Sequence, residues 1–394
     1  MSKVQREIYL DHAAATYLLP EVSKTLKPYL EKLYANPSSL HSQGLKVKTD
    51  IEKARDKIGK IINADPQEII FAGSGTESIN LALKGVAEAK KEGHIIVSKI
   101  EHPAVLDTCQ HLRKKGFEIT YLPVDLHGLV SPEDLENAIR NDTILISIMY
   151  ANNEIGTIEP IAELARIARR FNVPFHTDAC QAAGALDIDV KRLGVDLMTI
   201  NGSKIYGPKG IGILYKRSQI KLSPLIHGGG QEKGLRSGTE NVPAIIGLAK
   251  ALEIAQKERE KENKRLIALR DYLIKNVLKS IEGSLLNGSP EKRLPNNANF
   301  SFEGVEGESV MSFLSDEGVA VSTGSACGSQ DRKISHVLQA IGLDKKHLSG
   351  NIRISLGKRT TKKDIEYVLK VLPKIIQRLR KISKINLSQR RDNG

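Results

Sequence analysis

The stretch Thr143-Ile-Leu-Ile-Ser-Ile-Met149 is apolar at nearly every position. A strand with one face in water alternates apolar and polar residues, whereas a strand covered on both faces reads as an almost continuous apolar run. The stretch therefore predicts a strand in the interior of a sheet that helices cover on both faces.

Similar short runs lie on both sides of this stretch along the chain, and amphipathic segments of helical period separate them. The other predicted strands are 68–72, 94–98, 117–122, 174–177, 196–200 and 212–215. The predicted helices are 76–91, 103–115, 160–170 and one that begins at Pro132, behind the capping residue Ser131. This alternation predicts an α/β fold with a mostly parallel sheet sandwiched by helices.

The pattern changes after about residue 245, where a long helix rich in Glu and Lys is predicted over 243–280. The shorter apolar runs that follow indicate a smaller α+β unit. A chain of 394 residues is long enough for two or three domains. We therefore predict a large α/β domain of residues 15–258 and a small α+β domain formed by residues 1–14 together with 259–394.

The composition, with 40% hydrophobic and 27% charged residues, supports a large core and excludes a disordered chain. No apolar run approaches the roughly 18 residues of a membrane span, and the first residues lack the apolar centre of a secretion signal. Three cysteines, Cys109, Cys180 and Cys327, are too few and too scattered for a disulfide framework or a zinc motif. We therefore expect a cytoplasmic protein with free thiols and no resident metal.

The net charge of +13 raises the alternative of a nucleic-acid-binding protein. Residues 374–394 alone supply seven Lys or Arg against Asp392, and they contain no aromatic residue on which a base could stack. We therefore interpret this basic tail as a solvated helix end followed by a frayed terminus.

Polar residues follow five of the predicted strands, at the edge where an open α/β sheet binds its ligands. They are Gly73-Ser74-Gly75-Thr76, His102, Asn152 with Asn153, Asp178 with Gln181, and Asn201-Gly202-Ser203-Lys204. The glycine-rich turn is a candidate phosphate site, although an ordinary helix start would explain it equally well. A lysine for a Schiff base and an acid for a pyridine nitrogen complete the requirements of pyridoxal phosphate.

Longer motifs extend this interpretation over almost the whole chain. They are Tyr9-Leu10-Asp11-His12-Ala13-Ala14-Ala15-Thr16, Gly75-Thr76-Glu77-Ser78, Glu101-His102, Asn152-Asn153-Glu154-Ile155-Gly156, Asp178-Ala-Cys-Gln181, Lys204-Ile-Tyr-Gly-Pro-Lys-Gly210, His227-Gly-Gly-Gly230, Arg236-Ser-Gly-Thr239, Ser325-Ala326-Cys327 and Arg353-Ile-Ser-Leu-Gly357. The chain resembles the NifS/IscS-type cysteine desulfurases of the class V pyridoxal-phosphate-dependent aminotransferase family. The resemblance implies fold type I, with the cofactor bound by the large domain.

The resemblance also implies roles for residues around the cofactor ring. Lys204 would form the Schiff base and act as base at the substrate Cα, and Asp178 would keep the pyridine nitrogen protonated. His102 would stack on the ring and shuttle protons. Gln181 and Asn153 would support the edge that carries the phenolate oxygen.

At the phosphate end, the resemblance implies contacts from Gly75, Thr76, Asn201 and Ser203. Thr239 would reach the phosphate from a second subunit, so a homodimer is implied. The family usually has histidine where this chain has Ser203, and we expect the hydroxyl to retain the cofactor slightly less well.

Two further residues would act on the substrate. Arg353, with Asn153, would bind the carboxylate of L-cysteine in a planar two-point contact; an ion pair with a structural acid is the alternative. Cys327, in a loop of small residues over about 321–335, would take the sulfur as a persulfide and leave L-alanine. Cys327 is also a candidate transient ligand of an iron–sulfur cluster. Cys109 and Cys180 are interpreted as packed thiols.

The resemblance implies that the sulfur passes to an acceptor protein such as an iron–sulfur scaffold. The other destinations are thiolation of tRNA or of a cofactor, and the residues alone do not establish contact with tRNA. The alternatives within the same fold are a selenocysteine lyase and a small-amino-acid aminotransferase. A non-catalytic sulfur carrier or scaffold is the alternative outside enzymes.

Overall fold

The computed structural model describes residues 7–324 and 334–392, with side chains up to residue 382. Its main sheet has seven strands in the order β2-β8-β7-β6-β5-β3-β4. Within this sheet, β8 runs in the direction opposite to the other six strands. The bounds are β2 Ile69–Ala72, β3 His94–Ser98, β4 Glu118–Leu122, β5 Thr143–Ser147, β6 Phe175–Asp178, β7 Leu197–Asn201 and β8 Gly212–Lys216. The predicted mostly parallel sheet is confirmed.

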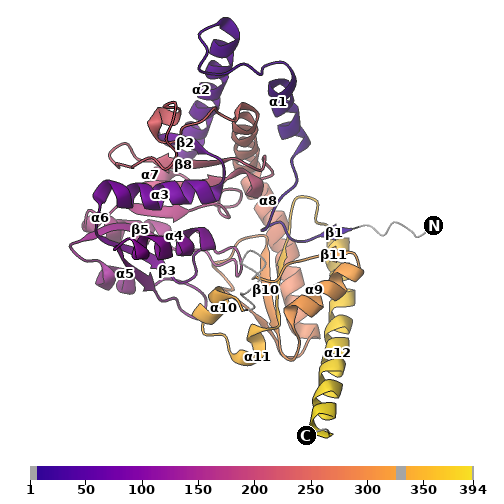
Figure 1. Cartoon of the computed structure of the whole chain (residues 1–394). Helices are drawn as coiled ribbons and strands as arrows, with labels where there is room; N and C mark the ends of the chain where they lie inside the picture. The colour runs from indigo at the N-terminus through magenta and orange to yellow at the C-terminus, as the bar shows by residue number, and fades with distance from the viewer. Residues whose placement is uncertain (1–6, 325–333, 393–394) are drawn as a thin grey trace.

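Helices cover both faces of this sheet (Figure 1). They are α1 Pro20–Glu31, α2 Ser42–Ile62, α3 Gly75–Lys90, α4 Pro103–Lys114, α5 Pro132–Ala138, α6 Ile161–Arg170 and α7 Val190–Leu193. In β5, Leu145 belongs to the core under α3 and α4, whereas Ile146 belongs to the core on the other face. The interior position expected for Thr143–Met149 is therefore confirmed.

A second core lies around a smaller sheet of antiparallel strands in the order β12-β10-β9. Its elements are β1 Ile8–Tyr9, β9 Ser284–Leu286, β10 Asn297–Phe302, α9 Gly307–Asp316, β11 Val319–Ala320, α10 His336–Ala340, α11 Lys345–Leu348, β12 Asn351–Ser355 and α12 Lys362–Asp392. The N-terminal strand β1 pairs with β11, so Leu10 is buried in this core, whereas Leu19 belongs to the first.

The long helix α8 (Val242–Ser280) connects the two cores, as Figure 1 shows. Leu252 in its first half is buried in the first core, and Leu273 in its second half is buried in the second. The helix predicted over 243–280 is confirmed, and both of its ends are fixed by packing.

Residues 374–392 all belong to α12, which continues to Asp392, so the predicted helix end extends over nearly the whole basic segment. Lys374, Arg378 and Lys381 are exposed, as expected for a solvated helix end. Val368, Leu372 and Ile376 recur at helical spacing and are buried in the second core, so the basic residues begin in the middle of a packed helix. Arg380 donates to the backbone oxygens of Glu282 and Glu303. Within the described residues, no helix combines the length and apolarity needed to cross a membrane.

Candidate active site

A cavity of about 180 Å³ lies beyond the carboxyl ends of the parallel strands, where the sequence predicted a ligand site. Nine of the predicted site residues line it: Gly75, Thr76, His102, Asn153, Asp178, Gln181, Asn201, Lys204 and Arg353. Its remaining walls are Ala13, Ile79, Met149, Ala151 and Cys180. The cavity therefore brings an amine, an imidazole, a carboxylate, amides and a guanidinium together.

Lys204 reaches this cavity from a 3-10 turn, Gly202–Lys204, that follows β7. Its Nζ donates to the carbonyl oxygens of Ala13 at 2.9 Å and of Ala14 at 2.6 Å. Gln181 Nε2 donates to the same Ala13 oxygen at 2.9 Å. The carbonyl groups of the N-terminal segment thus fix both the Lys204 amine and the side-chain amide of Gln181.

Asp178 is the last residue of β6, and it is buried at the cavity wall. Its Oδ1 accepts a hydrogen bond from the backbone N–H of Cys180 at 2.9 Å. Burial, and next the charge of Asp178, raise the pKa of the Cys180 thiol well above its usual value. Burial likewise raises the pKa of Cys109 to about 12. Both cysteines are buried and free, which confirms them as packed thiols.

His102 caps the N-terminus of α4, and its Nδ1 accepts the backbone N–H of Ala104 at 3.1 Å. A nitrogen that accepts a hydrogen bond carries no proton, so the neutral ring has its proton on Nε2. Burial lowers the pKa of His102, the charge of Asp178 opposes this, and that of Lys204 adds to it. The ring is therefore neutral near pH 7 and has one N–H available to the cavity.

The phosphate end predicted from the sequence lies at the first turn of α3. Gly75 has no room for a side chain, because a Cβ there would lie 2.9 Å from Cys180 Sγ and 3.2 Å from Asn201 Cβ. The positive end of a 16-residue helix, with Thr76 exposed beside it, suits an anion.

Two predicted phosphate residues lie elsewhere among the described residues. Ser203 Oγ donates to Asn201 Oδ1 at 3.2 Å and does not line the cavity. Thr239 is exposed on a separate cavity of about 140 Å³, together with Gly73 and Arg236. One chain by itself therefore does not bring Thr239 to Lys204.

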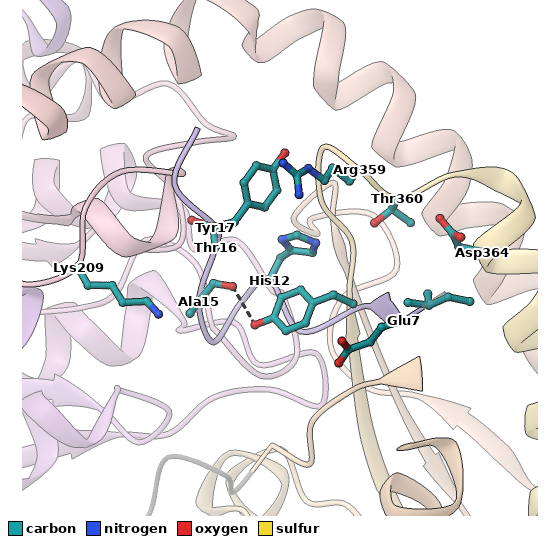
Figure 2. Close-up of a pocket in the computed structure, with 11 residues that line it drawn as sticks. Glu7, His12, Ala15, Thr16, Tyr17, Lys209, Arg359, Thr360 and Asp364 are labelled. Atoms are coloured by element: carbon teal, nitrogen blue, oxygen red, sulfur yellow. Dashed lines mark hydrogen bonds between the residues drawn. The ribbon is translucent and has the colours of Figure 1, made fainter. Parts of the chain in front are cut away.

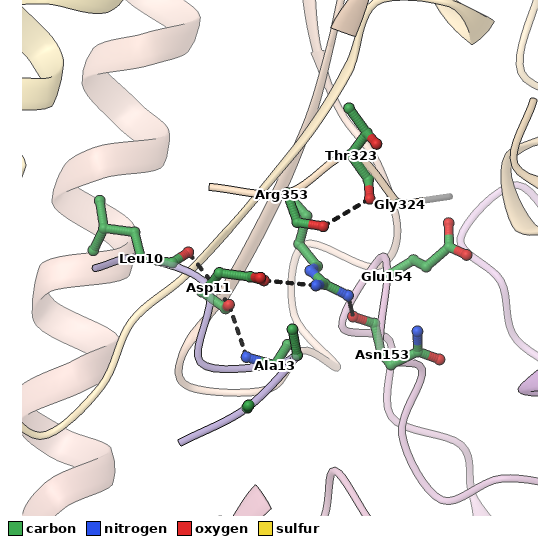
Figure 3. Close-up of polar contacts among 12 residues, drawn as sticks. Leu10, Asp11, Ala13, Asn153, Glu154, Thr323, Gly324 and Arg353 are labelled. Carbon is green, nitrogen blue, oxygen red and sulfur yellow. Dashed lines mark hydrogen bonds and ion pairs between the residues drawn. The ribbon is translucent and has the colours of Figure 1, made fainter. Parts of the chain in front are cut away.

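Arg353, on β12, is buried and crosses from the second core to the cavity (Figure 3). One terminal nitrogen pairs with Asp11 at 2.7 Å, and the other donates to the Asn153 carbonyl oxygen at 3.0 Å. Its Nε is buried and has no hydrogen-bond partner among the described residues. Asp11 does not line the cavity. Arg353 therefore lines the cavity, as predicted for a substrate contact, and it also forms an ion pair with a structural acid, which was the alternative.

Cys327 lies outside the described residues, as does most of the predicted loop over 321–335. The two described ends of that segment meet at one buried carboxylate. Ser335 Oγ donates to Glu154 Oε2 at 2.5 Å, and Gly324 packs so closely on Glu154 that it has no room for a Cβ. Burial raises the pKa of Glu154 to about 7.

Sequence reasoning gave Asp11, Glu101 and Glu154 no role, although all three stand in the quoted motifs. Glu101 is completely buried beside His102 and accepts hydrogen bonds from Ser98 Oγ at 2.6 Å and from Met149 N–H at 2.8 Å. Burial, more than any nearby charge, raises its pKa from 4.5 to about 8.

This shift predicts how stability depends on pH. Between pH 4.5 and about 8 the carboxyl of Glu101 is protonated in the folded chain and ionised in the unfolded one. Folding then takes up a proton, so stability falls as pH rises, by up to about 1.4 kcal/mol per pH unit. Glu101→Gln cannot ionise, so its stability relative to wild type should increase from pH 5 to pH 9 in urea unfolding. Glu88→Gln, at an exposed site, serves as the control. A difference between Glu101→Gln and wild type that is independent of pH would contradict this account.

The chain matches the family described as "Aminotransferase class-V" over residues 8–368. It is 56% identical over 382 residues to the cysteine desulfurase IscS of Dictyoglomus turgidum, covering 96% of this chain and 97% of that relative. A solved NifS-like protein shares 40% identity with a TM-score of 0.89, covering 94% of this chain and all of that one.

A second solved structure, described as SspA in complex with cysteine, shares 39% identity with a TM-score of 0.78. That match covers 89% of this chain and 98% of the solved one. Three observations point to the same family: the motifs around Lys204 and Asp178, the sheet that positions these residues, and the nearly full-length matches. The chain belongs to the class-V aminotransferases and, within that family, to the NifS/IscS-type cysteine desulfurases.

Proposed function

We propose that the protein converts L-cysteine to L-alanine and holds the released sulfur as a persulfide on Cys327, for delivery to an acceptor. The observation that carries the proposal is the single cavity that combines the Lys204 amine, the buried Asp178 carboxylate and the Arg353 guanidinium. The printed names of the relatives support it: one is a cysteine desulfurase, and another was solved with cysteine.

Members of this family depend on pyridoxal phosphate, and the cavity residues fit that group. Gly75 and Thr76 place the N-terminus of α3 on the cavity, where it would hold the phosphate, and Asp178 would supply a buried carboxylate for the pyridine nitrogen. Gln181 and Asn153 would hold the ring edge, Asn201 and Ser203 would support the phosphate end, and Lys204 would carry the cofactor. When bound, pyridoxal phosphate supplies the electron sink that acidifies the substrate Cα–H.

Two residues then move protons. The Lys204 amine takes the proton from the substrate Cα, and the adjacent carbonyls of Ala13 and Ala14 accept hydrogen bonds from the ammonium that results. His102 presents Nε2–H to the cavity and can donate and recover that proton. Since the pKa of His102 is lowered, the ring returns to its neutral form near pH 7.

The sulfur step belongs to Cys327. Its thiolate forms an S–S bond with the substrate sulfur while the substrate C–S bond breaks, and the electron pair of that bond stays with the carbon. The carbon skeleton takes up a proton and leaves as alanine. One cysteine and one enzyme thiol thus become one alanine and one persulfide, without an external oxidant or reductant.

The test uses the full chain reconstituted with pyridoxal phosphate and incubated with L-cysteine. We expect a visible absorption band before substrate, equal amounts of alanine and persulfide in a single turnover, and a mass increase of one sulfur at Cys327. A chain that stays colourless after reconstitution, or persulfide found only at Cys109 or Cys180, would overturn the proposal.

Arg353→Lys tests how the substrate carboxylate is held. A lysine keeps a positive charge near Asp11, but it offers a single donor point where the guanidinium offers a planar pair. We expect KM for L-cysteine to rise about tenfold or more, with kcat changed less. Arg217→Lys, in the exposed pair with Asp196, is the matched control. An unchanged KM would mean that Arg353 does not bind the substrate carboxylate and serves only in the ion pair with Asp11.

We further propose a homodimer in which Thr239 reaches the partner's phosphate site. Thr239 is exposed and lies away from the cavity of its own chain. At one edge of the molecule, where Figure 1 shows α1 and α2, Leu30, Tyr34 and Leu40 expose apolar side chains that a partner could cover.

The remaining parts of the proposal concern organisation and partners. The two cores support a cofactor domain of residues 15–258 and a small domain of residues 1–14 with 259–394 that carries the segment of Cys327. An iron–sulfur scaffold is the proposed acceptor, with tRNA as the competing destination of the sulfur. Free thiols at Cys109 and Cys180 suit action in the cytoplasm.

A further inference from the structure

The turn that carries Lys204 has an unusual backbone. Two residues after Lys204, Tyr206 has a left-handed φ of 62°, a conformation that disfavours bulky L-residues. Such a conformation persists only where its surroundings hold it, and it is found preferentially at functional sites. The contacts that hold Tyr206 in this conformation therefore also fix the position of the Lys204 backbone, from which the side chain extends.

Thr16 holds this turn on both sides of Lys204. Its backbone N–H and its Oγ1 both donate to the Ser203 carbonyl oxygen, at 3.0 Å and 2.9 Å. The same Oγ1 accepts the backbone N–H of Tyr206 at 2.8 Å. Thr16 itself is buried, and the two hydrogen bonds of its hydroxyl are partly buried. One hydroxyl thus links the residue before the lysine to the residue two positions after it.

The same short segment also contacts the lysine side chain. Three residues before Thr16, the Ala13 carbonyl accepts from Lys204 Nζ, and the Ala14 carbonyl does the same. Ala13 lines the active-site cavity, whereas Ala15 and Thr16 line a second cavity of about 450 Å³. Figure 2 shows Thr16 there, between Ala15 and Tyr17. The segment is therefore a wall between two cavities, and Lys204 is attached to it by both side chain and backbone.

We propose that Thr16 is a positioning residue for Lys204: its hydroxyl clamps the Ser203–Tyr206 backbone so that the amine meets the cofactor aldehyde in a fixed place. This inference rests on the proposed function. It requires the hydroxyl specifically, because a methyl group in its place can neither donate to Ser203 nor accept from Tyr206.

The experiment compares cofactor-free full-length wild type with Thr16→Val and Thr16→Ser. Absorbance gives the rate constant for attachment of pyridoxal phosphate, and borohydride reduction with peptide mapping locates it at Lys204. We expect attachment to slow about tenfold or more in Thr16→Val, because two partly buried hydrogen bonds are lost. Thr16→Ser keeps the hydroxyl and should attach at close to the wild-type rate.

Two further variants keep the test decisive. Thr49→Val removes a threonine hydroxyl that donates to the Leu45 carbonyl within α2, and it should attach cofactor like wild type. If Thr16→Val does not fold, Thr16→Ala removes the same hydroxyl without added volume and should show the same slowing.

The outcomes separate the two levels of inference. Wild-type attachment by Thr16→Val, or a Thr16→Ser variant as slow as Thr16→Val, overturns the positioning role while the proposed function stands. A lowered melting temperature without slower attachment also overturns it, because that is the result of a merely structural role. Wild-type protein that does not label at Lys204 overturns the proposed function and this inference together.

Discussion

Cys327→Ser is expected to abolish persulfide formation and to lower the rate of alanine formation by at least about 10³-fold. The substrate sulfur is attacked by a thiolate, and a serine hydroxyl stays un-ionised at neutral pH. Cys109 and Cys180, which the structure does describe, cannot take over the reaction. The pKa of Cys109 is raised to about 12, that of Cys180 lies well above its usual value, and both side chains are buried.

The measurement is single-turnover alanine release together with mass mapping of all three cysteines. Cys109→Ala is the matched control and should keep both products, since Cys109 lies on the buried face of α4 and packs in the core. The visible spectrum should be unchanged in Cys327→Ser, which shows that the cofactor is still bound. Alanine formed at the wild-type rate by this variant would favour another reaction of the fold, such as the lyase or transaminase chemistry considered from the sequence.

Lys204→Arg is expected to cost at least about 10³-fold in kcat with L-cysteine. Arginine keeps the positive charge and can still donate to the Ala13 and Ala14 carbonyls, so the fold should be retained. Its guanidinium remains protonated at all relevant pH values. It can neither attach the cofactor nor accept the Cα proton.

The control for this variant is Lys209→Arg, the same substitution five residues along, at a lysine that is exposed on the second cavity. Lys209→Arg should retain full activity and cofactor attachment. Absorbance, borohydride labelling and melting temperature together distinguish lost chemistry from lost folding. If Lys204→Arg still turns over cysteine at a rate near wild type, Lys204 is not the base.

The sequence was sufficient for the large sheet, because most of its strands are short apolar runs, such as β2 and β5, and amphipathic helical segments separate them. Thr143–Met149 needed no partner information to be recognised as an interior strand. The cluster at the strand ends followed for the same reason: parallel strands end at one edge, so His102, Asp178 and Lys204 had to converge. Local pattern and topology therefore predicted eight of the nine cavity residues, whereas Arg353, on β12, came from the family resemblance.

The contacts contributed by distant segments could not be read from local pattern. Asp11 pairs with Arg353, and Thr16 bonds to Ser203, in the segment that follows β1. No periodicity in the sequence predicts these contacts. The packing of α12 also depends on distant segments. Charge indicated only its solvated end, whereas Leu372 and Ile376 pack in a core assembled from other parts of the chain.

The pairing of β1 with β11 has a consequence for the synthesis of the protein. Ile8 aligns with Val319, and Asp11 bridges to Ser355, so the wall that holds Lys204 is closed by residues made more than three hundred positions later. Contacts of such separation form late, because the intervening chain must first be ordered. A nascent chain on the ribosome can complete its large sheet, but its reactive lysine is fully seated only when translation is nearly finished.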